Sequence, residues 1–175
     1  MPGVMGPTRD LGACQILFKG VDLGRTMGGV RFRFTETDAP VREDQMGSDP
    51  VDDINVGSTC SVEVPLTRMQ TAKIAALLAG ASGDGTSGNS MTVKQSVGVS
   101  RYARSGELVL KPLNGTAADP DTSKWLHVFK ASPQADIELV YDATTQRVYK
   151  MTFKGYPDQT SGNNARIWRI GPAVA

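Results

Sequence analysis

The chain has 175 residues, which is enough for one domain with a single packed core. Its formal net charge of +1 at pH 7 gives no general argument for binding nucleic acid or a membrane surface. No apolar run approaches the roughly 20 residues of a membrane span, and the N-terminus lacks the layout of a signal peptide. We therefore expect a soluble protein that is made in a cytoplasm.

Most of the chain alternates apolar and polar residues with a period of two, which is the pattern of half-buried β-strands. In the first such segment Cys14, Ile16 and Phe18 share one face. The strand candidates in chain order are residues 14–19, 29–34, 58–66, 108–113, 126–130, 137–141, 147–153 and 166–170. Residues 142–146 suit a hairpin turn. We expect a mainly β fold over residues 1–175, an antiparallel β-sandwich or barrel.

The two cysteines, Cys14 and Cys60, are too few for a disulfide framework. Each lies in phase with the apolar side of its strand candidate. We therefore predict reduced thiols within the core, although the sequence does not decide whether either forms a disulfide.

One flanking α-helix is expected after the strand at 58–66. Residues 67–70 have the spacing of a capping box, in which Thr67 and Gln70 satisfy each other's backbone amides. Residues 71–79 are rich in helix-forming residues, and Gly80 is a natural stop. The spacing turns Met69, Ile74 and Leu77 toward the sheet and Lys73 away from it. Residues 80–90 are rich in glycine and serine and are expected to form a flexible loop.

Residues 36–53 form a polar run with seven acidic residues and a single base, Arg42. They are predicted to form a long inter-strand loop over residues 36–57, attached to an otherwise basic body. A loop of about twenty residues is uncommon in a compact domain, and such loops often bind a partner. The acidic residues are Glu36, Asp38, Glu43, Asp44, Asp49, Asp52 and Asp53.

No combination of residues indicates catalysis, so we expect neither an enzyme nor a cofactor. His127 is the sole histidine and is predicted to face a neighbour or solvent from its strand. The acidic run and the pair Asp119 and Asp121 lack the spacing of an EF-hand, so no metal site is expected. Residues 80–90 lack the lysine of a phosphate-binding loop. Trp125 and Trp168 are predicted to be core or interface aromatics.

The order of several segments resembles that of phage tail-tube proteins (the major tail protein family). Residues 23–30 carry the family's Leu-Gly-x-Thr-x-Gly-Gly-Val pattern before the acidic run. Within the run, residues 44–52 read Asp-Gln-Met-Gly-Ser-Asp-Pro-Val-Asp, and Gly57 follows. The strand at 59–66, a helix, and the last strands at 148–158 and 167–171 then come in the family's order.

This resemblance implies a structural virion protein in which a β-sandwich with a flanking helix forms homohexameric rings. The rings would stack through the long loop into a tail tube, and DNA would pass through its lumen without specific binding. Other tail proteins, and possibly a sheath, would be partners of the protein in the virion, after its synthesis in the host bacterial cytoplasm. The loop residues expected to make the inter-ring contact are Arg42, Glu43, Asp44, Gln45, Asp49, Asp52 and Asp53.

Two other interpretations stay open at the level of sequence. The first is another tail component of the same fold, such as a tail terminator, a tube initiator or a type VI secretion tube protein. The second is a monomeric ligand-binding β-barrel whose mouth lies under the acidic loop. One feature departs from the tube: Arg31 and Arg33 share the outward face of their strand, whereas a DNA-conducting lumen should repel DNA weakly.

Overall fold

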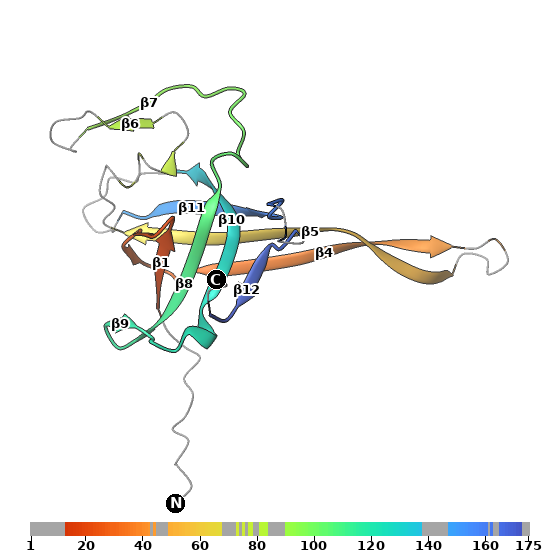
Figure 1. The fold of residues 1–175 in the computed structure, drawn as a ribbon. Helices are drawn as coiled ribbons and strands as arrows, with labels where there is room; N and C mark the ends of the chain where they lie inside the picture. Colours follow the sequence, from red (N-terminus) through yellow and green to blue (C-terminus); the bar gives the residue numbers. More distant parts are fainter. Residues whose placement is uncertain are drawn as a thin grey trace, which may run out of the picture.

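The computed structural model describes residues 13–172, apart from 43, 45–48, 68–72, 74, 76, 79–80, 84–89, 138–146, 161 and 163–164. Twelve strands and one short 3-10 helix are defined in it (Figure 1). The elements in chain order are β1 (Cys14–Phe18), β2 (Val21–Asp22), β3 (Arg25–Thr26), β4 (Arg31–Arg42), β5 (Pro50–Thr67), β6 (Ala81–Gly83), β7 (Met91–Val93), β8 (Gly106–Asn114), β9 (Ala117–Ala118), η2 (Thr122–Lys124), β10 (Leu126–Asp136), β11 (Tyr149–Tyr156) and β12 (Trp168–Ile170).

Ten of these strands form one antiparallel sheet, in the order β2-β1-β8-β10-β11-β5-β3. Off this path, β4 pairs with β5, β9 with β8, and β12 with β10, while β6 and β7 form a separate two-stranded sheet. Over the described residues, this sheet does not close into a barrel. The mainly β, antiparallel prediction is therefore confirmed, and the open sheet is consistent with a sandwich.

Strand β10 joins the two halves of the sheet. Its first residues, 126–128, pair with β12 and β8, whereas residues 130–136 pair with β11. The register against β8 shifts between Val128 and Ala131, which is the mark of a β-bulge. A bulge bends a strand and increases its twist, so β10 changes direction here. Figure 1 shows β1 and β8 crossing the direction of β5 and β11 as a result.

The core lies between these two halves, and the period-two pattern locates it correctly. Residues 60, 62, 64 and 66 of β5 are all buried, with exposed fractions of 0–1%. They pack with apolar residues of β1, β8 and β11 in one cluster. The rings of Phe18 and Phe153 lie 5.3 Å apart within it. Cys60 is buried and Cys14 is half-buried against the core, and both are free thiols, as predicted.

The predicted long loop is wrong over most of its length. Strand β4 continues to Arg42 and β5 begins at Pro50, so residues 36–42 and 50–57 are strands, and only residues 43–49 connect them. The two strands pair antiparallel from Arg31–Glu63 to Arg42–Pro50. Backbone groups form this ladder whatever the side chains are, so a polar, acidic sequence does not prevent it.

The predicted helix is only partly described. Lys73, Ala75 and Leu77 have helical backbone and Leu77 is buried, but Met69, Gln70 and Ile74 lie outside the described residues, so the helix as a whole stays a prediction. Thr67 is the last residue of β5, and its hydroxyl donates to the Arg25 carbonyl at 3.2 Å. Lys73 does not simply face solvent, because its Nζ donates to the Asp22 carbonyl at 2.6 Å.

Two further expectations need adjustment. Part of the predicted flexible loop is ordered into strand, since Ala81–Gly83 is β6 and pairs with β7; residues 84–89 lie outside the described part. The predicted strand at 137–141 is not seen at Ile137, where β10 has already ended, and its other residues, with the whole predicted hairpin turn at 142–146, are outside the described part.

Candidate assembly surfaces

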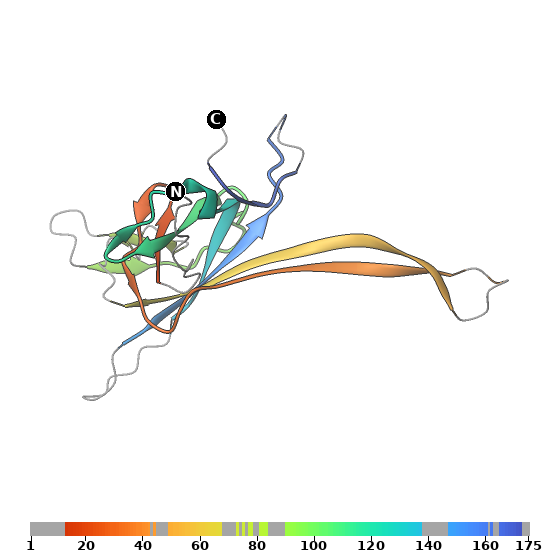
Figure 2. The same ribbon diagram turned by 90° about the horizontal axis from the view of Figure 1, so that it is seen from below.

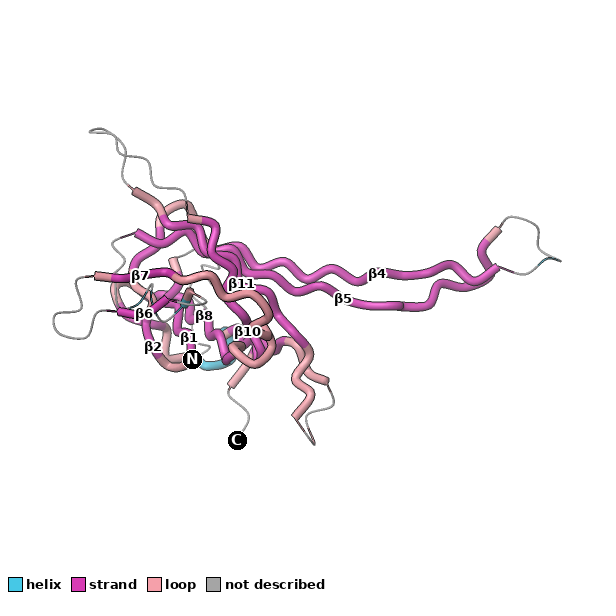
Figure 3. The backbone as a smooth tube through the Cα atoms, turned by 90° about the horizontal axis from the view of Figure 1, so that it is seen from above, coloured by secondary structure: helices cyan, strands magenta, loops and turns pink. Residues whose placement is uncertain are grey.

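The most prominent feature of the molecule is the arm, defined here as residues 35–42 of β4 and 50–59 of β5. Figures 1, 2 and 3 all show it projecting from the body as a two-stranded ribbon. All ten residues of its β5 part are exposed, and burial begins abruptly at Cys60. At about 3.3 Å per residue, this part is about 30 Å long. A lone two-stranded ribbon is at best marginally stable in water, so the arm lacks the packing that would stabilise it.

The root of the arm is anchored firmly in the body. Phe32 and Phe34 of β4 pack against Trp168 of β12, with ring centroids 5.4 and 5.6 Å apart. On the other strand, Cys60 lies opposite Gly155 of β11, where a Cβ would come within 2.9 Å of the cysteine Cβ and Sγ. The close contact requires glycine at this position. The arm thus extends from a well-packed point.

The two faces of the arm differ in chemistry. Directly paired residues share a face, and faces alternate along each strand. Glu36, Asp38 and Asp53 therefore lie on one face, the acidic face, where Asp53 is the neighbour of Pro40 across the strands. Ala39, Val41 and Ile54 lie on the other, the apolar face, since Ala39 is opposite Ile54. Ile54 is 54% exposed.

Two register shifts leave additional apolar side chains on the arm. The pairing steps from Thr37–Gly57 to Asp38–Asn55, so Val56 is an extra residue, and it is 61% exposed. The pairing also steps from Val41–Asp52 to Arg42–Pro50, so Val51 is a second extra residue, and it is 41% exposed. Exposed apolar side chains that recur along one element are typical of a surface that contacts a partner.

The sequence-predicted contact residues gather on the outer part of this arm. Arg42 ends β4, and Asp44 and Asp49 are exposed at the tip, while Glu43 and Gln45 lie outside the described residues. Asp52 and Asp53 fall on opposite faces, because they pair with Val41 and Pro40. The amide of Asp53 donates to Asp52 Oδ1 at 2.8 Å.

Sequence reasoning did not find the apolar part of this surface. The signal was present, since Val51, Ile54 and Val56 are β-branched residues typical of strands. Their spacing is irregular because of the two register shifts, so no period-two pattern emerged.

A groove of about 550 Å³ lies at the other end of β5, and we call it the far groove. Its outward-facing lining includes Arg31, Glu63, Pro65 and Lys150, which are brought together by the pairs Arg31–Glu63 and Pro65–Lys150. Met27 forms one wall and is 50% exposed. Its amide donates to the Pro65 carbonyl at 3.0 Å, which fixes the turn before β4 against the end of β5.

A second groove of about 290 Å³ lies beside the segment between β7 and β8. Its lining combines apolar Leu77, Val99 and Pro133 with Arg101 and Arg104. Arg104 Nη2 donates to the Leu77 carbonyl at 3.3 Å, so this guanidinium already has a partner in the protein.

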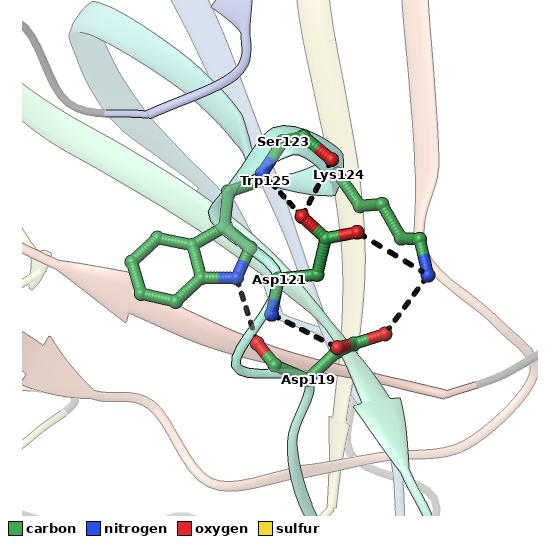
Figure 4. Close-up of polar contacts among 5 residues, drawn as sticks. All are labelled: Asp119, Asp121, Ser123, Lys124 and Trp125. Atoms are coloured by element: carbon green, nitrogen blue, oxygen red, sulfur yellow. Dashed lines mark hydrogen bonds and ion pairs between the residues drawn. The ribbon is translucent and has the colours of Figure 1, made fainter.

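The acidic turn at residues 119–125 is closed by its own contacts (Figure 4). Asp119 Oδ1 accepts from the Asp121 amide, and Asp121 Oδ1 accepts from the amide and hydroxyl of Ser123. These bonds, with the ion pairs to Lys124, hold the pKa of both carboxyls below the ordinary value. The Trp125 indole donates to the Asp119 carbonyl at 3.0 Å. Each carboxylate is thus used within the turn.

His127 has the role of a neighbour-facing strand residue, as predicted. It is buried in β10, and its Nδ1 lies 2.8 Å from Glu107 Oε1 of β8.

Trp168 packs on the root of the arm, and Trp125 lies under the Lys111 ammonium, 3.8 Å from the ring centroid. Within the described part of the chain, no group of three or more His, Cys, Asp or Glu residues could hold a metal ion.

No helix in the described ranges is both long and apolar enough to cross a membrane. Comparison of the sequence with protein-family models found no match, and comparison with curated proteins found none either.

Proposed function

We propose that the protein is the subunit of a phage tail tube, a structural virion protein that assembles as stacked homohexameric rings around a DNA-conducting lumen. The single observation that carries this proposal is the arm. It projects as an unsupported ribbon with Val51, Ile54 and Val56 between 41% and 61% exposed. Such a ribbon is stabilised when it lies against another molecule, and a repeating assembly provides an identical partner for every arm.

The order of motifs supports the same proposal. The Leu-Gly-x-Thr-x-Gly-Gly-Val segment at residues 23–30 leads directly into β4, and the described residues of the acidic motif, Asp44 and 49–52, lie at the outer end of the arm. The resemblance to tail-tube proteins implies an inter-ring contact within residues 42–53, and this stretch includes the outer end of the arm. An acidic arm on a basic body also favours a head-to-tail arrangement, since complementary charges orient encounter.

Open sheet edges give a route to ring closure. In the described part of the chain β4 pairs with β5 alone, so the edge of β4 in the body is available to another strand. Pairing between copies that closes a ring removes the aggregation risk of such an edge. The exposed bases Arg31 and Arg33 lie on the outward face of β4, and we assign this face to a neighbouring subunit or a sheath and not to the lumen.

The other interpretations receive different support. A tail terminator, tube initiator or secretion tube protein would need the same arm, and the length of the assembly distinguishes them. A ligand-binding barrel is disfavoured by two observations: the sheet is open, and the acidic residues project away from the body instead of covering a mouth.

The test is the assembly state of the purified protein. Sedimentation velocity over a wide concentration range and negative-stain microscopy should show rings and stacked tubes. Because tube proteins often need an initiating complex, the same measurements are made with nucleating tail-tip proteins added. A protein that stays monomeric under all these conditions would contradict the proposal, and short, non-growing rings would favour a terminator.

A further inference from the structure

We propose that the acidic face of the arm of one copy docks in the far groove of the next copy, with Arg31 and Lys150 of the groove facing Asp38 and Asp53 of the arm. The inference rests on the proposed function, because it names the receptor for the arm within the stack. Four observations support it: the placement of the two surfaces, their charges, their apolar parts and the size of the groove.

Both surfaces belong to the same strand. Strand β5 carries the arm at its beginning, residues 50–59, and the far groove near its end, at Glu63 and Pro65. Figures 1 and 3 show the arm leaving one side of the body while the other end of β5 lies on the opposite side. A contact from the beginning of β5 in one copy to its end in the next is head-to-tail, and it can repeat without limit.

The charges of the two surfaces are complementary. The acidic face carries Glu36, Asp38 and Asp53, against one base, Arg42, at its outer end. The outward lining of the far groove has two cations, Arg31 and Lys150, against one anion, Glu63. All three are exposed; in the ladder Glu63 lies opposite Arg31, while Lys150 lies between Pro65 of β5 and Asp136 of β10.

The apolar parts of the surfaces are also suited to each other. Pro40 lies beside Asp53 on the acidic face and is exposed. In the far groove, Met27 is 50% exposed and lies beside Pro65. A flexible methionine adapts to an irregular partner surface, so Met27 and Pro65 provide a suitable contact for Pro40.

The second groove is a weaker receptor for the arm. It is about half as large, 290 against 550 Å³, and Arg104 is already used by the Leu77 carbonyl. It also lies away from the strand that carries the arm. These differences select the far groove.

The experiment is a charge swap between the two surfaces, read out as the concentration at which tubes form. Asp53→Lys alone should raise this concentration at least about tenfold, because a weak contact repeated around a ring acts as a multivalent array. Adding Lys150→Asp should restore it to within about threefold of the unmodified protein. The matched control is Lys154→Asp, since Lys154 is exposed on the same face of β11 but four residues nearer the arm. Lys154→Asp should not rescue Asp53→Lys. Circular dichroism of every variant checks that the monomer is folded.

Four results would overturn the inference. If Lys150→Asp gives no rescue in a folded double variant, the far groove is not the receptor. If Arg101→Asp rescues Asp53→Lys instead, the second groove is. If Asp53→Lys has no effect while the unmodified protein forms tubes, the acidic face is not the contact, although the proposed function stands. Failure of the unmodified protein to assemble in any condition would contradict both this inference and the proposed function.

Discussion

The arm should be dispensable for folding but required for assembly. The structure defines a clean truncation, because Glu36 and Ser58 lie directly opposite each other near the root. Replacing residues 37–57 by Asn-Gly joins these two positions with a two-residue turn of the type that suits antiparallel strands. Cys60, Phe34 and their packing partners stay in place.

The expected loss of stability follows from burial. None of the described residues in the deleted part is buried, and only Ala39 and Val41 are half-buried. Changes to surface residues usually alter the free energy of unfolding by about 0.5 kcal/mol or less, so we expect a loss of no more than about 1 kcal/mol for the truncation. For comparison, Phe153 is fully buried, and Phe153→Ala should cost about 3–5 kcal/mol.

Urea unfolding followed by circular dichroism measures both variants, and sedimentation measures their assembly. The truncated protein should unfold near the midpoint of the full chain, with a slightly smaller m-value because less chain is exposed on unfolding. It should form no tubes. A loss of more than about 2 kcal/mol would show that the arm belongs to the folded core, and normal tubes would show that it is not the stacking element.

Two further predictions concern the root of the arm. Gly155→Ala should destabilise the protein by about 1–3 kcal/mol, because the new Cβ would lie 2.9 Å from the Cys60 Cβ and Sγ and 3.2 Å from Val128 Cγ1. The matched control Gly57→Ala, which has open space around its Cβ, should be nearly neutral in the same thermal-unfolding assay; equal effects would refute the packing argument. Burial raises the pKa of Cys60 from 9.0 to about 11, so above pH 9 the unfolded chain loses a thiol proton that the folded chain keeps. The free energy of unfolding should therefore fall between about pH 9 and 11 more steeply in the unmodified protein than in Cys60→Ala. Identical pH profiles would show that this thiol ionises alike in both states.

The sequence determined which residues form the core of the strands. The alternation at Val62, Val64 and Leu66 predicted buried positions that the structure confirms, and Phe32 and Phe34 follow the same pattern. This works because a strand has a strict two-residue period, and one of its faces must leave water. The burial of Cys60 followed from the same phase. The resemblance of residues 23–30 and 44–52 to tail-tube proteins also came from sequence alone.

Only the tertiary structure decided that residues 36–42 and 50–57 are strands. Asp, Gly and Pro are poor strand formers, and the register shifts at Val56 and Val51 break the period that sequence reasoning depends on. What makes this segment a ribbon is backbone pairing between residues 8 to 26 positions apart, from Arg42–Pro50 at the outer end to Phe34–Cys60 at the packed root. The same pairing places Asp52 and Asp53, neighbours in sequence, on opposite faces. It also brings Arg31 and Lys150 to one groove from distant strands, and neither fact can be read from local sequence.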